Sequence, residues 1–199
     1  NPCSEEAIKK DAISKSKFGL SEHKKLVLIV MGSLGASKVN EFFKNSIKLF
    51  NNKDYEVLYV TGNSSYESFS KIKVPSNVKV VPYIEDLTRI MKKTDIMVSR
   101  AGASTLSEIE ALSIPSILIP SPYVPDNHQY KNAMDLVNKK CAIILEEKDL
   151  KGDILVRKID ELIKNEKEMT EMKENLKNSG IKNSATFIYE NIKKLIDRK

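Results

Sequence analysis

Short apolar runs recur along the chain and alternate with segments of helical periodicity. Mostly apolar runs of strand length are typical of strands that are covered on both faces of a sheet. The strands predicted in this way are Leu26–Met31, Glu56–Thr61, Val78–Val81, Ile96–Ser99, Ser116–Ile119 and Ala142–Leu145. Strands that alternate with helices predict an α/β fold with a Rossmann-like, doubly wound parallel sheet.

The spacing of apolar residues also predicts where the helices lie. Helical patterns cover Val39 to Phe50, a turn or two from Ile84 to Lys92, a stretch from about Ser104, and His128 to Lys139. Beyond Leu150 the periodicity is helical only and suits three helices. The sheet core therefore spans about residues 24–146, and a helical C-terminal part spans about 151–199. An antiparallel fold would need two-residue hairpin turns, which are missing where they would be required.

Composition narrows the class of protein. A chain of 199 residues can bury one domain, and no apolar run approaches the roughly 20 residues of a membrane-spanning helix. The net charge of +6 comes from lysines dispersed among acidic residues, which favours a solvated surface and leaves an anionic partner as an alternative. Aromatic and basic residues do not alternate, so we expect no nucleic-acid partner.

Cysteine and histidine are too scattered for a metal site. Cys3 and Cys141 lie far apart, and His23 and His128 are the only histidines. This spacing argues against structural zinc and predicts reduced thiols in a cytosolic protein.

A glycine-containing loop, Gly32–Ala36, joins the first strand to its helix. Small residues and free N–H groups at a helix start favour an anion, and Ser33 adds a hydroxyl. The loop lacks the third glycine of the dinucleotide fingerprint, and the second strand ends on Thr61 rather than an acidic residue. It also lacks the Gly-Lys-Ser/Thr of a Walker loop. A purely structural tight turn is the alternative.

The segment Ser99–Glu108 carries a richer pattern. Gly102 makes a bare turn, and Ser104 and Thr105 then stand where a new helix exposes unpaired N–H groups, which suits a diphosphate. Glu108 follows one turn later, and its carboxylate suits the two adjacent hydroxyls of a ribose. The alternative is ordinary helix capping, with Thr105 and Glu108 as a capping box.

The loop Pro120–Ala133 delivers a third group of polar residues. Asp126, Asn127 and Gln129 suit sugar hydroxyls, whereas His128 fits a capping or packing residue better than a general base. A solvated loop with Asp126 or Asn127 as N-cap is the alternative. Because the three loops share one sheet edge, they predict a pocket for a nucleotide diphosphate that carries a polar group.

These segments resemble the MurG family. The resemblance rests on Gly32–Ala36 with Asn40, on Ser99–Ile109 and on His128–Ala133, and Asn1-Pro2 is similar to the segment that opens the family's C-terminal domain. It implies one half of a GT-B glycosyltransferase, namely the C-terminal donor-binding domain over residues 1–199. The N-terminal acceptor domain would be absent, so the chain is expected to be a fragment.

The resemblance also implies a donor site for UDP-GlcNAc. Ser33 would contact the diphosphate region, Ile84 would present its backbone to uracil, and Glu108 would bind the ribose. Gln129 would hydrogen-bond the sugar. The remaining residues that would line the donor are Ala103, Ser104, Thr105, Leu106 and Ser107. Two positions depart from the family pattern: Ser4 replaces an arginine and Met31 replaces a glycine.

The activity implied is that of a hexosyltransferase which adds GlcNAc to undecaprenyl-diphospho-muramoylpentapeptide in peptidoglycan synthesis. It inverts the anomeric centre without a cofactor or metal, and the chain has no Asp-x-Asp motif. The catalytic base is expected in the missing domain, so the chain alone should be inactive. The lipid-linked acceptor and the cytoplasmic face of the inner membrane would be its partners. A stand-alone donor subunit of a two-chain transferase and a non-catalytic nucleotide-sugar sensor are alternatives.

Overall fold

The computed structural model describes residues 3–31, 37–179 and 184–196. One parallel sheet forms the centre, with the strand order β3-β2-β1-β4-β5-β6. Its strands are β1 Leu26–Val30, β2 Glu56–Val60, β3 Val78–Val81, β4 Ile96–Ser99, β5 Ser116–Leu118 and β6 Ala142–Ile144. All six match the predicted strands to within one residue, and the order is that of a Rossmann fold, so the predicted fold class is confirmed.

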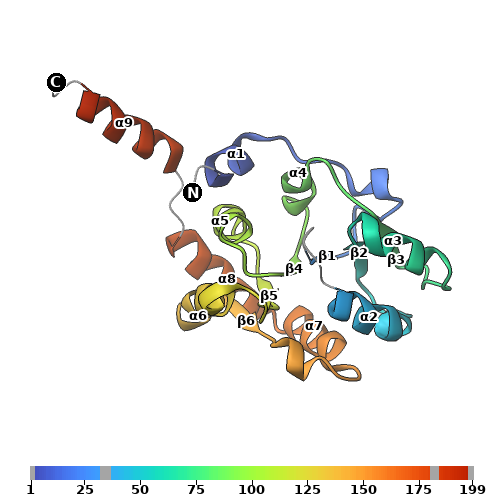
Figure 1. Cartoon of the computed structure of the whole chain (residues 1–199). Helices are drawn as coiled ribbons and strands as arrows, with labels where there is room; N and C mark the ends of the chain where they lie inside the picture. Colours follow the sequence, from blue (N-terminus) through green and yellow to red (C-terminus); the bar gives the residue numbers. More distant parts are fainter. Residues whose placement is uncertain (1–2, 32–36, 180–183, 197–199) are drawn as a thin grey trace.

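Helices cover both faces of the sheet (Figure 1). They are α1 Cys3–Lys9, α2 Ser37–Ser46, α3 Asn63–Ser70, α4 Leu87–Met91, α5 Ala103–Leu112, α6 His128–Asn138, α7 Ile154–Lys164, α8 Glu166–Ser179 and α9 Ser184–Ile196. Short 3-10 turns lie at η1 Lys15–Phe18, η2 Ile47–Phe50, η3 Pro125–Asn127 and η4 Glu147–Asp149. The sequence patterns predicted all of the longer helices except α1 and α3.

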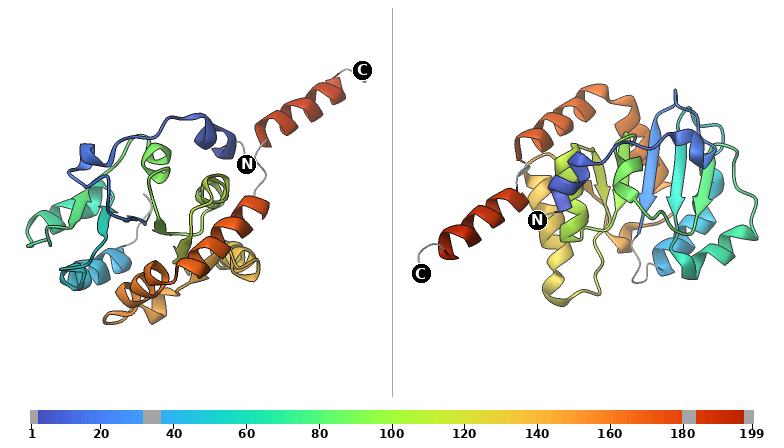
Figure 2. Two further views of the ribbon diagram at one scale, coloured as in Figure 1. Left: turned by 180° about the vertical axis from the view of Figure 1, so that it is seen from behind. Right: turned by 90° about the horizontal axis from the view of Figure 1, so that it is seen from above.

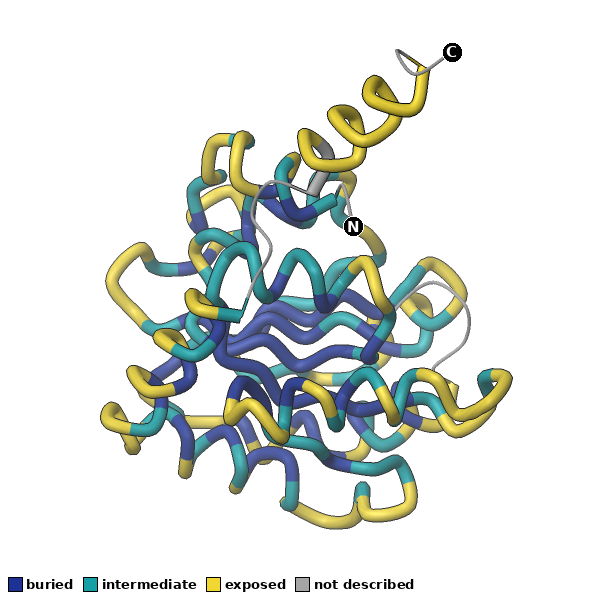
Figure 3. Tube along the Cα trace, turned by 90° about the vertical axis from the view of Figure 1, so that its left-hand side faces the viewer, coloured by how far each residue is buried: buried dark blue, intermediate teal, exposed yellow. Residues whose placement is uncertain are grey.

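The strands bury side chains on both faces, as their apolar runs predict. In β1, Val27 and Ile29 join one cluster with residues of α2, α3 and α7, whereas Leu26 and Leu28 join a second with residues of α4, α5 and α6. The centre of the sheet is accordingly buried throughout (Figure 3). Each such buried aliphatic side chain favours folding by about 1.5–3 kcal/mol, so the two clusters fix the sheet between its helical layers.

The helices that connect the strands switch from one face of the sheet to the other on the two sides of β1. From β1 through β3 the helices α2 and α3 pack on one face, and α4 then leads to β4 on the other side of β1. The strands lie side by side with their carboxyl ends at one edge (Figure 2). In such sheets, ligands bind outside the carboxyl ends where the strand order reverses, which here is between β1 and β4.

The ends of the described chain meet at α1. This helix packs against α5 and also contacts α9. The Thr186 N–H donates to Glu5 Oε2 at 3.1 Å. Beyond this contact α9 leads away from the body (Figure 1), and its apolar side chains, predicted to form one side of a helix, are exposed: Phe187 at 66% and Leu195 at 65%. Within the described ranges, no helix is both long and apolar enough to span a bilayer.

Candidate functional site

A cavity of about 750 Å³ lies at the strand ends beside this reversal point. The ends of β1 and β2 contribute Val30 and Val60. The rest of its wall comes from α1 with Lys10 after it, the start of α3, the loop between β3 and α4, the start of α4, and α5. The polar and charged residues along it are Glu6, Lys10, Asn63, Ser64, Glu85, Asp86, Thr88, Thr105 and Glu108. A volume of this size suits a small organic ligand.

Three of the predicted site residues meet in this cavity. Ile84 lies in the loop between β3 and α4, packs on the core and lines the cavity. Thr105 and Glu108 line it from α5, where a spacing of three residues puts them on one face of the helix. The fold thus brings together residues that are distant in the sequence.

The start of α5 does not form the predicted capping box. Gly102 is the N-cap residue and makes no side-chain cap bond, so the helix begins ahead of Thr105. Thr105 is then the third helical residue, and Ala103 and Ser104 are the first two. The first turn of α5 therefore begins four residues after the last residue of β4, at the carboxyl edge of the sheet. The capping interpretation of Thr105 and Glu108 is wrong because the helix starts too early for it.

Two further predicted residues on α5 face elsewhere. The Leu106 side chain is 5% exposed and belongs to the core. The Ser107 hydroxyl donates to the Ala103 carbonyl oxygen at 2.8 Å, one turn back. Neither residue lines the cavity, nor do Ala103 and Ser104. Their part in binding a donor stays a prediction.

Glu108 is a half-buried carboxylate of the cavity. Burial raises its pKa above the ordinary value, and the negative charge of Glu6 raises it further, whereas Lys10 lowers it. Lys10 itself is paired with two carboxylates: its Nζ lies 2.8 Å from Glu6 Oε1 and 2.8 Å from Asp86 Oδ1. The charge of Glu108 at a given pH therefore depends on Glu6 of α1 and on Lys10, which directly follows that helix.

The loop between β5 and α6 lies outside the lining of this cavity. Gln129 Oε1 accepts the Ser121 N–H at 2.9 Å. Asp126 and Asn127 both have positive φ, and Asn127 is the N-cap position of α6 without a side-chain cap bond. His128 Nδ1 donates to the Pro125 carbonyl oxygen at 3.0 Å. The role of Gln129 toward a sugar stays a prediction.

Side chains nevertheless tie the loops after β4 and β5 together. Asn132 on α6 donates to the Ala101 carbonyl oxygen at 3.2 Å. Arg100 Nη1 donates to the Ile119 carbonyl oxygen at 3.1 Å, and the same guanidinium pairs with Glu147. These bonds hold the polar loop of α6 next to the start of α5, as the sequence predicts for loops on one sheet edge.

The remaining positions that the sequence analysis singled out are Ser33, Ser4 and Met31. Ser33 lies outside the described residues. Ser4, which stands where the MurG family has arginine, is buried and does not line the cavity, whereas its neighbour Cys3 does. Met31 is buried in the core.

Among the residues that the structure describes, no group of three or more His, Cys, Asp or Glu is placed to hold a metal ion.

The sequence pattern did not predict helix α1, which forms one wall of the cavity. The segment Cys3–Lys9 has few apolar residues and no clear stripe, so its periodicity does not reveal a helix. One signal was present, because Glu5 with Lys9 and Glu6 with Lys10 have the i,i+4 spacing that stabilises a helix, and both ion pairs form at 2.8 Å. The start of α3, which also lines the cavity, follows Gly62 at φ 79°.

Comparison with known proteins decides the family. The model of the glycosyltransferase family 28 C-terminal domain matches residues 26–188, which is most of the chain. The chain belongs to this family. The match covers the whole sheet and the helices that pack on it, so the fold described above is the fold of a family 28 C-terminal domain.

Two curated relatives of this family 28 C-terminal domain are named for the same transferase activity, and the identities given below are those of this domain to each of them. It is 43% identical to the UDP-N-acetylglucosamine--N-acetylmuramyl-(pentapeptide) pyrophosphoryl-undecaprenol N-acetylglucosamine transferase 1 of Bacillus cereus, across 100% of this chain and 56% of the relative. The corresponding transferase of Bacillus subtilis is 39% identical, across 98% of this chain and 55% of the relative. The chain thus spans about half the length of the curated relatives it matches.

A solved structure shares the fold. The crystal structure of Acinetobacter baumannii MurG has a TM-score of 0.75 and 24% identity, across 90% of this chain and 52% of that one. Together with the relatives, this confirms the resemblance to the MurG family and the Rossmann-like fold that it implied.

Proposed function

We propose that this domain binds UDP-GlcNAc for an inverting N-acetylglucosaminyltransferase. The acceptor would be undecaprenyl-diphospho-muramoylpentapeptide, so that the reaction belongs to peptidoglycan synthesis. The observation that carries the proposal is the cavity in which Ile84, Thr105 and Glu108 meet at the reversal point of the sheet. The names of the relatives, which are 39% and 43% identical, supply the sugar and the acceptor.

Each part of the donor has a place in this proposal. The uracil lies against the backbone of Ile84, and Glu108 accepts hydrogen bonds from the ribose hydroxyls. The diphosphate lies at the start of α5, where backbone N–H groups and the helix dipole favour negative charge. Ser33 would contribute at the diphosphate and Gln129 at the sugar, both on the strength of the sequence pattern.

The chemistry follows from this placement. An acceptor hydroxyl forms a bond to the anomeric carbon from the face opposite UDP, while the bond between that carbon and the diphosphate oxygen breaks. Negative charge grows on the leaving diphosphate, and the first turn of α5 stabilises it. The proton of the attacking hydroxyl goes to a base that we expect in a domain outside this chain. On its own, this domain should bind donor without transferring sugar.

The proposed partners follow from the same activity. The lipid-linked acceptor would reach the reaction centre through the second domain, and the enzyme would work at the cytoplasmic face of the cell membrane. We propose no metal and no other cofactor, since the sequence has no Asp-x-Asp motif.

Calorimetry with UDP, and with ADP as a base control, tests the donor site. Glu108→Ala should weaken UDP binding by about 1–3 kcal/mol, the range for losing a charged hydrogen-bond partner. Glu110→Ala is a matched control, because Glu110 is a partly buried carboxylate on the same helix that does not line the cavity. It should leave the affinity unchanged. Equal affinities of wild type and Glu108→Ala would refute the ribose assignment.

Transfer needs a second assay. The domain would be joined to an N-terminal half of a relative and supplied with labelled UDP-GlcNAc and the lipid-linked acceptor. We expect sugar transfer by the joined protein and none by this domain alone. A joined protein that binds UDP-GlcNAc but transfers nothing would overturn the enzyme assignment while leaving the donor site standing.

A further inference from the structure

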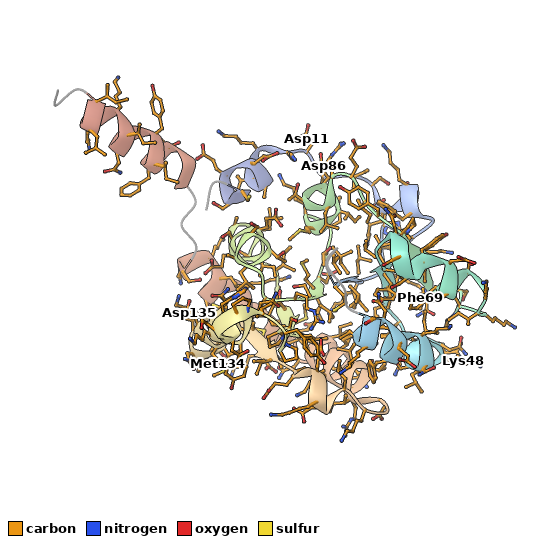
Figure 4. The ribbon with its side chains drawn as sticks, viewed as in Figure 1. Asp11, Lys48, Phe69, Asp86, Met134 and Asp135 are labelled. Carbon is orange, nitrogen blue, oxygen red and sulfur yellow. The ribbon has the colours of Figure 1, made fainter. Side chains whose placement is uncertain are left out.

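Helix α1 gives the proposed donor site a charged wall that the sequence pattern does not reveal. It packs against α5, and its Glu6, together with Lys10 just after it, lines the same cavity as Glu108. The Lys10 ammonium lies 2.8 Å from Glu6 Oε1 on its own side and 2.8 Å from Asp86 Oδ1 on the other. Figure 4 shows Asp86 beside α4, on the side of the molecule where α1 lies. One cation thus joins two walls of the cavity.

Glu6 of α1 and Lys10 just after it also act on the carboxylate that would bind ribose. After burial, which is the largest cause, the charges that change the pKa of Glu108 are Glu6, which raises it, and Lys10, which lowers it. The other charged or ionisable groups on the elements around it are Cys3, Glu5 and Lys9 on α1, Glu85 and Asp86 before α4, Arg89 on α4, and Glu166, Lys167, Glu168, Glu171, Lys173, Glu174 and Lys177 on α8. Glu5, Lys9, Arg89 and the charged residues of α8 do not line the cavity.

Ionisation matters for a ribose ligand. A carboxylate accepts hydrogen bonds at both oxygens, whereas the protonated acid has lost part of that capacity and its charge. A half-buried carboxyl with a second carboxylate nearby would protonate early as the pH falls. A cation at the same wall opposes this effect and widens the pH range in which the site can bind a diol.

We propose that Lys10 is a positioning residue of the donor site, which links α1 to Asp86 across the cavity and offsets the negative charge that surrounds Glu108 there. The inference rests on the proposed function, since only a diol ligand gives the charge of Glu108 this importance. Lys10 is not assigned a contact with the nucleotide itself.

The direct test follows the side-chain carboxyl signal of Glu108 by NMR as the pH is varied, without nucleotide. Lys10→Met removes the cation and should move the Glu108 titration to higher pH. Glu6→Gln removes the nearby anion and should move it to lower pH. Opposite directions from two neighbouring substitutions are what an electrostatic role requires. An unmoved titration in Lys10→Met would overturn the inference.

A matched control separates charge in the cavity from anchoring of α1. Lys92 Nζ donates to the Ile8 carbonyl oxygen at 2.7 Å and also bonds the Lys10 carbonyl oxygen, yet Lys92 does not line the cavity. Lys92→Met loses the same charge and loosens the same helix, so it should leave the Glu108 titration in place. A shift equal to that of Lys10→Met would overturn the inference in favour of a purely structural effect.

UDP affinity measured against pH then links the titration to binding. In Lys10→Met the acid-side loss of affinity should begin at higher pH, with a loss of roughly twofold to fivefold against wild type within the range where Glu108 titrates, the scale of one partly exposed charge pair. In a Glu108→Gln background the same substitution should have no pH-dependent effect. If Glu108→Ala binds UDP normally, the ribose assignment of the proposed function fails, and this inference fails with it. If it binds weakly and Lys10→Met titrates as wild type, only this inference fails.

Discussion

Replacing Asn40 by alanine should destabilise the domain by about 2–4 kcal/mol. The Asn40 side chain lies on α2 and is 6% exposed. Its Nδ2 donates to the Thr61 carbonyl oxygen at 3.1 Å and to Ser65 Oγ at 2.7 Å, and its Oδ1 accepts the hydroxyl of Tyr59. One amide thus connects α2 to the end of β2 and to α3.

The magnitude follows from what remains after the substitution. Each hydrogen bond contributes about 1 kcal/mol net, and a buried polar group left without a partner costs about 1–3 kcal/mol. The hydroxyl of Tyr59 is such a group, because the residue is 1% exposed and burial raises its pKa well above the ordinary range. It therefore stays a donor throughout the working pH range, and alanine offers it no acceptor.

The assay is urea unfolding followed by circular dichroism, since the chain contains no tryptophan. Asn45→Ala is the matched control: Asn45 is an exposed asparagine on the same helix, and its loss should change the free energy of unfolding by less than about 0.5 kcal/mol. Tyr59→Phe with Asn40→Ala completes a double-mutant cycle. We expect a coupling energy of about 1 kcal/mol or more between the two side chains.

Two outcomes would refute this reasoning. A loss below about 1 kcal/mol for Asn40→Ala would mean that the three bonds are not worth their usual net value. A coupling energy of zero with Tyr59→Phe would mean that the two side chains do not depend on each other.

The remaining predictions concern the cavity wall. Gly62 has φ 79° and ψ 152°, a region open essentially to glycine alone, so Gly62→Ala should lower the free energy of unfolding by about 1–3 kcal/mol. Gly102→Ser should not lower it, because φ there is −72° and a new Cβ meets nothing within 4 Å. UDP should slow the alkylation of Cys3, which lines the cavity, as measured by mass spectrometry. Cys141 should stay unreactive with or without UDP, since it is buried and burial raises the pKa of its thiol. Equal labelling of Cys3 in both conditions would contradict the location of the nucleotide.

The sheet was predictable because its strands are buried on both faces. A continuous apolar run such as Leu26–Val30 has the length of a strand and is far too short to span a membrane, so a central strand accounts for it best. The helix Asn63–Ser70 escaped the same reasoning because its sequence is rich in serine, a weak helix former, and only Phe69 is buried. Its helical form depends on tertiary packing, which a local pattern does not contain.

The candidate site likewise contains residues that the sequence predicts and residues that only the packing reveals. Glu108 and Ile84 follow strands, so topology alone predicts that they lie at one edge of the sheet. Glu6 and Lys10 follow no strand, and as charged residues near the start of the sequence they resemble a solvated surface. Only the packing of α1 on α5 makes them part of the cavity. For Gln129, the sequence predicts a position near the same edge, but the lining of the cavity does not include it.

One short helix touches both the cavity and the last helix of the chain. On one side, α1 and the residue after it present Glu6 and Lys10 to the cavity, and on the other Glu5 accepts hydrogen bonds from Thr186 of α9. Helix α1 thus lies between the cavity and α9 and contacts both. A fluorophore attached to the outer part of α9 would lie away from the proposed donor site, and its signal would change on nucleotide binding if that binding shifts α1. Such a change would make the domain a scaffold for a nucleotide-sugar sensor with its label outside the binding site.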